Sequence, residues 1–183
     1  MKTFLTILGL LAAAILQTSL LPFLALGEVV PNLVLVLIGL LVIFKDFRKV
    51  WGLVVLGSLF LDLFSGLPFG LISLSLVVTA YCLSQFKRSL FSEIKFWIVL
   101  FLIGLASLFY NLVLTGLGEL FILVDLSRAE IYPTVISLNY LANLFLAAFY
   151  NIILLTFLYG LKKIFYQEQS SGKYRSRRNF FRR

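Results

Sequence analysis

The chain has 183 residues, of which 61% are hydrophobic and only 13% are charged, with a formal net charge of +8. Soluble domains are about 45–50% apolar and about 25% charged, and a chain of this size cannot hide such an excess inside one small globule. The sequence has no histidine and one cysteine, which excludes imidazole-based general base catalysis, a Cys/His zinc site and an internal disulfide. The composition predicts a membrane protein and argues against an enzyme.

Charged clusters divide the chain into apolar runs of helical length. A helix of about 20 residues crosses the hydrocarbon core of a bilayer, which is about 30 Å thick. The runs cover residues 4–26, 29–44, 50–83, 96–114 and 138–161. The third run holds two spans, because the string Gly66–Gly70 places two glycines around Pro68 and should break a helix. We expect an all-α protein with one domain of six transmembrane helices, residues 1–161, and a basic tail, residues 162–183.

Two stretches depart from this simple pattern of spans. The second run is short, which predicts either local thinning of the bilayer or burial behind neighbouring helices. After the fifth run, the lone G-x-G at Gly116–Gly118 predicts a helix end. The apolar stretch Leu120–Val124 then follows in the outer segment, where it would lie along the membrane surface or face a partner's helix.

Lysine and arginine are distributed unevenly between the two sides of this six-span arrangement. Fifteen of the 16 lie at the N-terminus, in the loops 45–49 and 84–95, or in the tail, whereas only Arg128 falls on the other side. That other side carries five acidic residues, namely Glu28, Asp62, Glu119, Asp125 and Glu130. Because positive charge stays on the cytoplasmic side of a membrane, we expect both termini in the cytoplasm.

Asp62 is the only acidic residue within an apolar run, and polar residues in such positions are candidates for function. Ser58 and Gly66 lie one helical turn away on either side of it. Asp62 either caps the turn that contains Gly66, Pro68 and Gly70 by accepting backbone N–H groups, or it forms a proton or ion site. The sequence leaves both interpretations open.

Amide side chains mark the first and the sixth spans. In the sixth span Asn139, Asn143, Ala147 and Asn151 recur every four residues and share one face about 120° wide. We expect this face to be buried as hydrogen-bonding contact between helices, with a polar conduit as the alternative. Gln17 in the first span is expected to bond a neighbouring helix, with ligand contact as its alternative.

Small residues also recur in the first span. Gly9 and Ala13 form a small-xxx-small pair, which allows the backbones of two helices to approach closely. The pair is a candidate either for packing inside the protein or for docking the helix of another protein.

Motifs for catalysis and for cofactor binding are absent from the sequence. An aspartyl protease needs two carboxylates that share a proton, whereas only Asp62 lies in a span. The chain contains no phosphate-binding glycine motif and no acidic cluster for Mg²⁺. We therefore expect no catalytic residue, no cofactor and no metal.

The tail, residues 162–183, combines basic residues with aromatic ones, which include Tyr174, Phe180 and Phe181. Its eight cations are Lys162, Lys163, Lys173, Arg175, Arg177, Arg178, Arg182 and Arg183. Anionic lipid attracts such a segment by about 1 kcal/mol per residue near the surface. We expect the tail to bind anionic lipid, with an acidic protein partner as the alternative, and we expect no binding of nucleic acid.

Three stretches of this sequence resemble the rod shape-determining protein MreD family. The most specific is Gly57–Gly70, which is similar to that family's G-x-x-x-D-x-x-x-G-x-P-x-G motif, although Gly57 lies one position further from Asp62 than the first glycine of the motif does. The others are Leu16–Pro22 and Pro31–Leu33. Asn32 stands where many members have an acid, and beyond Lys95 only the pattern of spans agrees.

The resemblance implies a multi-pass, non-enzymatic protein of the bacterial inner membrane that takes part in cell elongation and peptidoglycan synthesis. Members associate with the single-span protein MreC, and through it with the MreB filament, RodA and a class B penicillin-binding protein. The family is also similar in fold to the substrate-binding components of energy-coupling-factor vitamin transporters. The alternative function is therefore a transporter subunit that binds a small molecule near Gln17, Asp62 and the asparagines of the sixth span.

Overall fold

The computed structural model describes residues 2–27, 29–90, 95–123 and 140–160. The regular structure in these ranges is helical, so the expectation of an all-α protein is confirmed for them. The elements are α1 (Lys2–Ser19), a short 3-10 helix η1 (Leu21–Leu24), α2 (Leu33–Phe44), α3 (Phe47–Ser65), α4 (Leu71–Leu90), α5 (Phe96–Leu123) and a last helix, Tyr140–Gly160, called the C-terminal helix below.

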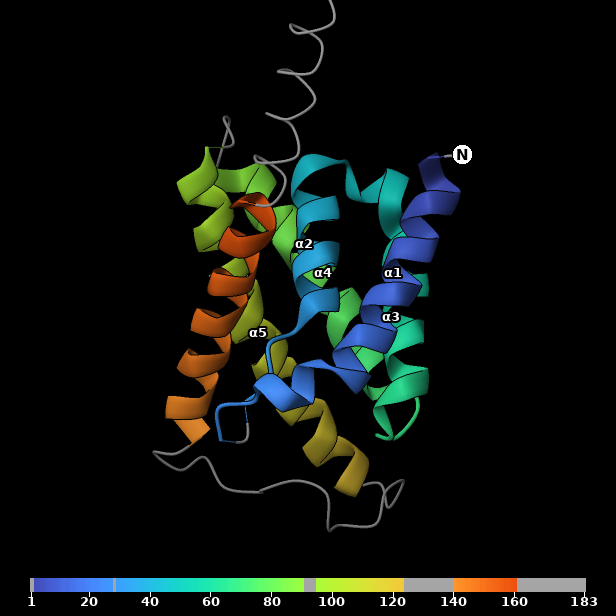
Figure 1. The fold of residues 1–183 in the computed structure, drawn as a ribbon, viewed down its shortest axis with the longest axis vertical. Helices are drawn as coiled ribbons and strands as arrows, with labels where there is room; N and C mark the ends of the chain where they lie inside the picture. The colour runs from blue at the N-terminus through green and yellow to red at the C-terminus, as the bar shows by residue number, and fades with distance from the viewer. Residues whose placement is uncertain (1, 28, 91–94, 124–139, 161–183) are drawn as a thin grey trace, which may run out of the picture.

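The long helices run roughly side by side and alternate in direction along the chain (Figure 1). The start of α1, the loop from α2 to α3 and the end of the C-terminal helix therefore lie at one end of the bundle, called the N-terminal end below. The turn from α3 to α4 lies at the opposite end. The helix α2 is shorter than its neighbours and begins part-way along the bundle.

The helix α2 is the centre of the core, since it packs against α1, α3, α4 and α5. Its 12 residues are almost all apolar, and Val34, Val36 and Ile43 are fully buried. A methyl group added at Gly39 would overlap the side chain of Ile103, so α2 and α5 approach each other closely there. The short second run is accommodated by burial behind neighbouring helices, which was one of its two interpretations.

Two of the described helices are long and apolar enough to cross a membrane. They are Phe96–Phe121, with a mean hydropathy of 2.3, and Tyr140–Gly160, with a mean hydropathy of 2.0. Only a third and about a fifth of their residues are buried in the structure. Both helices expose large apolar side chains, among them Trp97, Phe101, Phe145 and Phe157. The apolar helices Thr3–Ser19 and Leu33–Phe44 are shorter.

Two helices end at other positions than the apolar runs suggest. The first run does not form one helix through residue 26, because Pro22 lacks an N–H group and disfavours helix at the residue before it; α1 ends at Ser19. The predicted helix end at Gly116–Gly118 is wrong, since α5 continues through Leu123. Each glycine costs a helix only about 1 kcal/mol, and the apolar sequence around them continues.

Candidate functional site

The turn between α3 and α4 depends on two glycines with left-handed backbone conformations. Gly66 ends α3 with a φ of 71°, and Gly70 precedes α4 with a φ of 96°. Residues with a Cβ rarely adopt such angles. Between them the carbonyl of Pro68 accepts a hydrogen bond from the N–H of Leu71 at 3.2 Å. The predicted break in the third apolar run therefore lies where the glycines and the proline were expected to place it.

Asp62 connects this turn to the start of α4. Its side chain, on a residue that is only 3% exposed, accepts hydrogen bonds from the N–H of Gly70 at 2.5 Å and the N–H of Ile72 at 3.2 Å. The hydroxyl of Ser73 donates a third at 2.8 Å. A helix N-terminus has unpaired N–H groups and a partial positive charge, both of which favour an anion. The capping interpretation of Asp62 expects these contacts, in which the carboxylate accepts hydrogen bonds from backbone N–H groups.

The other residues of the Gly57–Gly70 stretch support the same helix packing. Ser58 is fully buried, and its hydroxyl donates to the carbonyl of Val55 in its own helix at 2.9 Å. A methyl group built on Gly57 would lie 3.2 Å from the Leu10 side chain of α1. The stretch thus provides a close contact with α1, a buried capping carboxylate and a sharp turn within 14 residues.

A second polar cluster, formed by Gln17, Asn32, Ser107 and Asn151, surrounds the start of α2 and is called the α2 cluster below. Asn32 is the N-cap, since its side-chain oxygen accepts from the N–H of Leu35 at 2.8 Å. The Gln17 oxygen accepts from the backbone N–H of residue 34 at 2.9 Å. The backbone N–H of Asn32 donates to the Asn151 side-chain oxygen at 2.6 Å. Three N–H groups at this helix start are thus paired by side chains.

The asparagines of the sixth span have different surroundings. Asn151 is 2% exposed, and its amide also donates to the Ser107 hydroxyl at 2.6 Å, which joins the C-terminal helix to α5. Asn143 is half-buried. Asn139 lies outside the described residues. Of the polar residues predicted in the first and sixth spans, the structure therefore brings together Gln17 and Asn151.

Within the described bundle Gly9 and Ala13 do not pack as a pair against another helix, and docking of another protein's helix stays a prediction. Ala13 is buried in the core, whereas Gly9 is exposed and has nothing within 4 Å of where its Cβ would lie. The reason is that α1 places Gly9 beside a cavity rather than against another helix.

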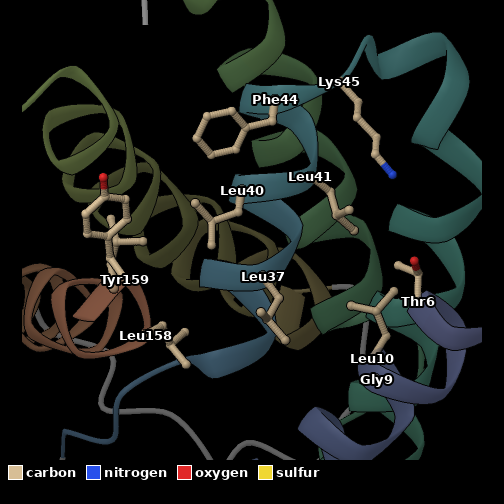
Figure 2. Close-up of a pocket in the computed structure, with 11 residues that line it drawn as sticks. Thr6, Gly9, Leu10, Leu37, Leu40, Leu41, Phe44, Lys45, Leu158 and Tyr159 are labelled. Atoms are coloured by element: carbon tan, nitrogen blue, oxygen red, sulfur yellow. The ribbon is translucent and has the colours of Figure 1, made fainter. Parts of the chain in front are cut away.

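This apolar cavity has a volume of about 410 Å³ and lies between α1, α2 and the C-terminal helix. Figure 2 shows the lining side chains around the outer face of α2, with Lys45 at its end. The lining residues are Thr6, Gly9, Leu10, Leu37, Leu40, Leu41, Phe44, Lys45, Leu155, Leu158 and Tyr159. The cavity opens to the surface, because Phe44 is 62% exposed and Tyr159 is 50% exposed. The polar clusters at the other helix ends contribute no side chain to it.

An exposed ion pair joins the loop before α3 to the end of α4 at the N-terminal end. The Arg88 guanidinium lies 2.9 Å from the Asp46 carboxylate. The hydrogen bond from Arg88, together with its positive charge, holds the pKa of the Asp46 carboxyl below its ordinary value. In the described part of the chain, no three histidine, cysteine, aspartate or glutamate side chains come together as metal ligands do.

Sequence reasoning did not find three residues of these clusters. Asn32 follows a proline and precedes an apolar helix, which is a recognisable helix-start pattern and could have identified it as an N-cap. Ser73 and Ser107 had no such signal, since serines within apolar runs usually bond to their own helix. Their partners Asp62 and Asn151 come from other helices.

Comparison of this chain with protein-family models, with curated proteins and with solved structures gave no match. Its function is therefore inferred from its residues, their geometry and the resemblance of its motifs.

Proposed function

We propose that this chain is a six-span protein of the bacterial inner membrane with both termini in the cytoplasm. The described cationic residues beyond α1 support this orientation, because they lie in or next to the helix ends at the N-terminal end of the bundle (Figure 1). They are Lys45, Arg48, Lys49, Lys87, Arg88 and Lys95. Of the described acidic residues, Asp62 and Glu119 belong to the opposite ends of their helices, whereas Asp46 lies among the cations. Such a distribution is typical of a protein whose basic loops face the cytoplasm.

The proposed function is that of a non-enzymatic component of the bacterial cell-elongation complex that binds MreC. RodA, MreB and a class B penicillin-binding protein would belong to the wider complex. The observation that carries this proposal is the Gly57–Gly70 stretch, in which the residues of the MreD-like motif have connected structural roles. Gly57 adjoins α1, Asp62 caps α4, and Gly66 and Gly70 form the turn. If the resemblance to the motif were due to chance, the motif residues would not be expected to contribute to the same turn and helix contact.

An exposed ridge on the C-terminal helix offers a surface for the single transmembrane helix of MreC. Its large apolar side chains recur every four residues and point away from the core: Leu141, Phe145, Phe149, Ile153 and Phe157. Helices in a membrane associate through van der Waals packing rather than through the hydrophobic effect. This packing would position the peptidoglycan synthesis machinery without any chemical step.

The vitamin-transporter alternative requires several polar side chains that converge on a pocket. In this structure the half-buried amide of Gln17, the buried amide of Asn151 and the buried carboxylate of Asp62 bond to the starts of α2 and α4. The cavity, in contrast, is lined mainly by hydrocarbon. This arrangement favours the elongation component over the transporter subunit.

Depletion of the protein in rod-shaped cells tests the function. We expect depleted cells to become round, and we expect the wild-type chain to restore rods and to co-purify MreC. Phe149→Ala should weaken co-purification, whereas Phe64→Ala, at an exposed phenylalanine of α3, should not. Depleted cells that stay rod-shaped but lose uptake of a vitamin would support the transporter instead.

Alkaline phosphatase fusions test the orientation separately. The enzyme is active only outside the cytoplasm, so a fusion after Arg183 should be inactive and a fusion after Arg128 should be active. An active fusion at the C-terminus would contradict the six-span arrangement.

A further inference from the structure

The apolar cavity between α1, α2 and the C-terminal helix has one cationic group at its rim. Lys45 follows the last residue of α2, and its side chain extends from there toward α1 (Figure 2). We propose that this cavity binds an anionic phospholipid of the cytoplasmic leaflet, with one acyl chain in the cavity and the phosphate beside Lys45. The assignment of the leaflet depends on the proposed orientation.

The walls of the cavity suit a hydrocarbon chain. They consist chiefly of leucines from three helices, and the exposure of Phe44 and Tyr159 leaves the cavity open to the surrounding lipid. A thin, flexible acyl chain can lie along such leucine walls.

The charge at the rim selects for an anionic head group. Among the described residues, Arg88 forms an ion pair with Asp46. The carboxylate that is next to Lys45 in the sequence is therefore already paired with Arg88. Lys45 therefore has no carboxylate partner in that part of the chain. Cytoplasmic lipids supply phosphate at this depth, and a lysine near the membrane surface attracts it by about 1 kcal/mol.

The same charge disfavours a protein helix as the occupant. Single-span proteins carry lysine and arginine at the cytoplasmic end of their helix. A helix placed in the cavity would bring these cations next to Lys45, where the like charges would repel each other. Lipid with a negative head group has the opposite sign and gains from the same contact.

Native mass spectrometry of the purified full chain in detergent, titrated with phosphatidylglycerol or phosphatidylcholine, tests the proposal. We expect phosphatidylglycerol to bind more tightly than phosphatidylcholine, with Lys45 contributing about fivefold, which corresponds to one such charge contact. Lys45→Ala should lower this preference about fivefold, because the basic tail still attracts anionic lipid, and Lys45→Arg should keep it. Arg48→Ala is the matched control, because it removes an exposed charge three residues away that does not line the cavity.

A second pair of variants tests whether the acyl chain occupies the cavity. Gly9→Leu places a side chain into the open space and improves helix propensity, so it should weaken binding of both lipids without loss of fold. Gly52→Leu makes the same change in α3 away from the cavity and should leave binding unchanged. The midpoint of thermal unfolding, followed by dye labelling of Cys82, verifies that each variant is folded.

Several results would overturn this proposal. An equal loss of preference in Arg48→Ala would mean that diffuse surface charge attracts the lipid. Unchanged lipid binding in Gly9→Leu would exclude the cavity as the site of the acyl chain. A loss of MreC co-purification in Gly9→Leu with lipid binding intact would assign the cavity to a protein helix. Because binding is measured on the purified chain, it can fail while depleted cells still become round, and the reverse also holds.

Discussion

Replacement of Asp62 separates a capping role from an ion site, and the structure provides the magnitude. Asp62→Leu keeps a side chain of similar size but removes every acceptor for the N–H groups of Gly70 and Ile72 and for the hydroxyl of Ser73. A buried donor without a partner costs about 1–3 kcal/mol. The two N–H groups together give a loss of about 2–4 kcal/mol, because Ile72 is buried whereas Gly70 is only partly so.

Asp62→Asn should have an intermediate effect. The asparagine amide keeps one acceptor oxygen. Its NH₂ group replaces the other carboxylate oxygen and cannot accept the hydrogen bond that this oxygen accepts in the wild type. The Oδ2 atom accepts from Gly70 and Ser73, and the Oδ1 atom accepts from Ile72, so either orientation of the amide loses at least one bond. We expect a loss of about 1–2 kcal/mol, roughly half of that for leucine.

The thermal unfolding of the chain in detergent measures both losses, because Cys82 is the only cysteine, is half-buried and reacts with a thiol dye on unfolding. Asp46→Leu is the matched control, since it makes the same chemical change at an exposed aspartate, where only a surface ion pair is lost and the midpoint should fall less than in Asp62→Leu. The midpoint should fall in the order wild type, Asn, Leu. An ion site requires the negative charge, so it predicts equal effects of Asn and Leu on function. Equal midpoints for the two variants would refute the capping explanation.

Three further predictions concern the core and the loop before α3. Asn151→Leu should lower stability by about 1–3 kcal/mol because it leaves the buried N–H of Asn32 without an acceptor and the Ser107 hydroxyl without its donor, whereas the same change at half-buried Asn143 should cost less; thermal unfolding compares the two. Gly39→Ala should cost about 1–3 kcal/mol through overlap with α5, while Gly52→Ala, which meets nothing, should be neutral or stabilising in the same assay. The hydrogen bond from Arg88 lowers the pKa of the Asp46 carboxyl in the folded protein. The charged Asp46 carboxylate therefore stabilises the fold above its unfolded pKa of about 3.9, and this stabilisation is lost as the pH falls further. In Asp46→Asn the free energy of unfolding should depend less on pH in the acid range. The same pH dependence as in the wild type would contradict a stabilising ion pair.

The positions of the helices could be predicted from the sequence to a large extent, because helix formation depends on local information. An apolar run favours a helix wherever it occurs, and Gly66, Pro68 and Gly70 break it through their own backbone preferences. The same local reasoning failed at Gly116 and Gly118, where it predicted a helix end inside α5. Single glycines in a helix carry only a small cost, so the continuing apolar pattern prevailed.

The partners of the polar residues were decided by the tertiary structure alone. The backbone N–H of Asn32 meets the side chain of Asn151 across 119 positions of the chain, and Gln17 meets the start of α2 across 17. The sequence identified Gln17, Asp62 and Asn151 as polar groups in apolar surroundings, because each is costly to bury unpaired. The sequence did not predict at which helix start each side chain would accept a hydrogen bond, because that depends on how the helices pack. A hydrogen bond needs its two atoms within about 3 Å, and only the packed bundle brings residues so distant in the chain that close.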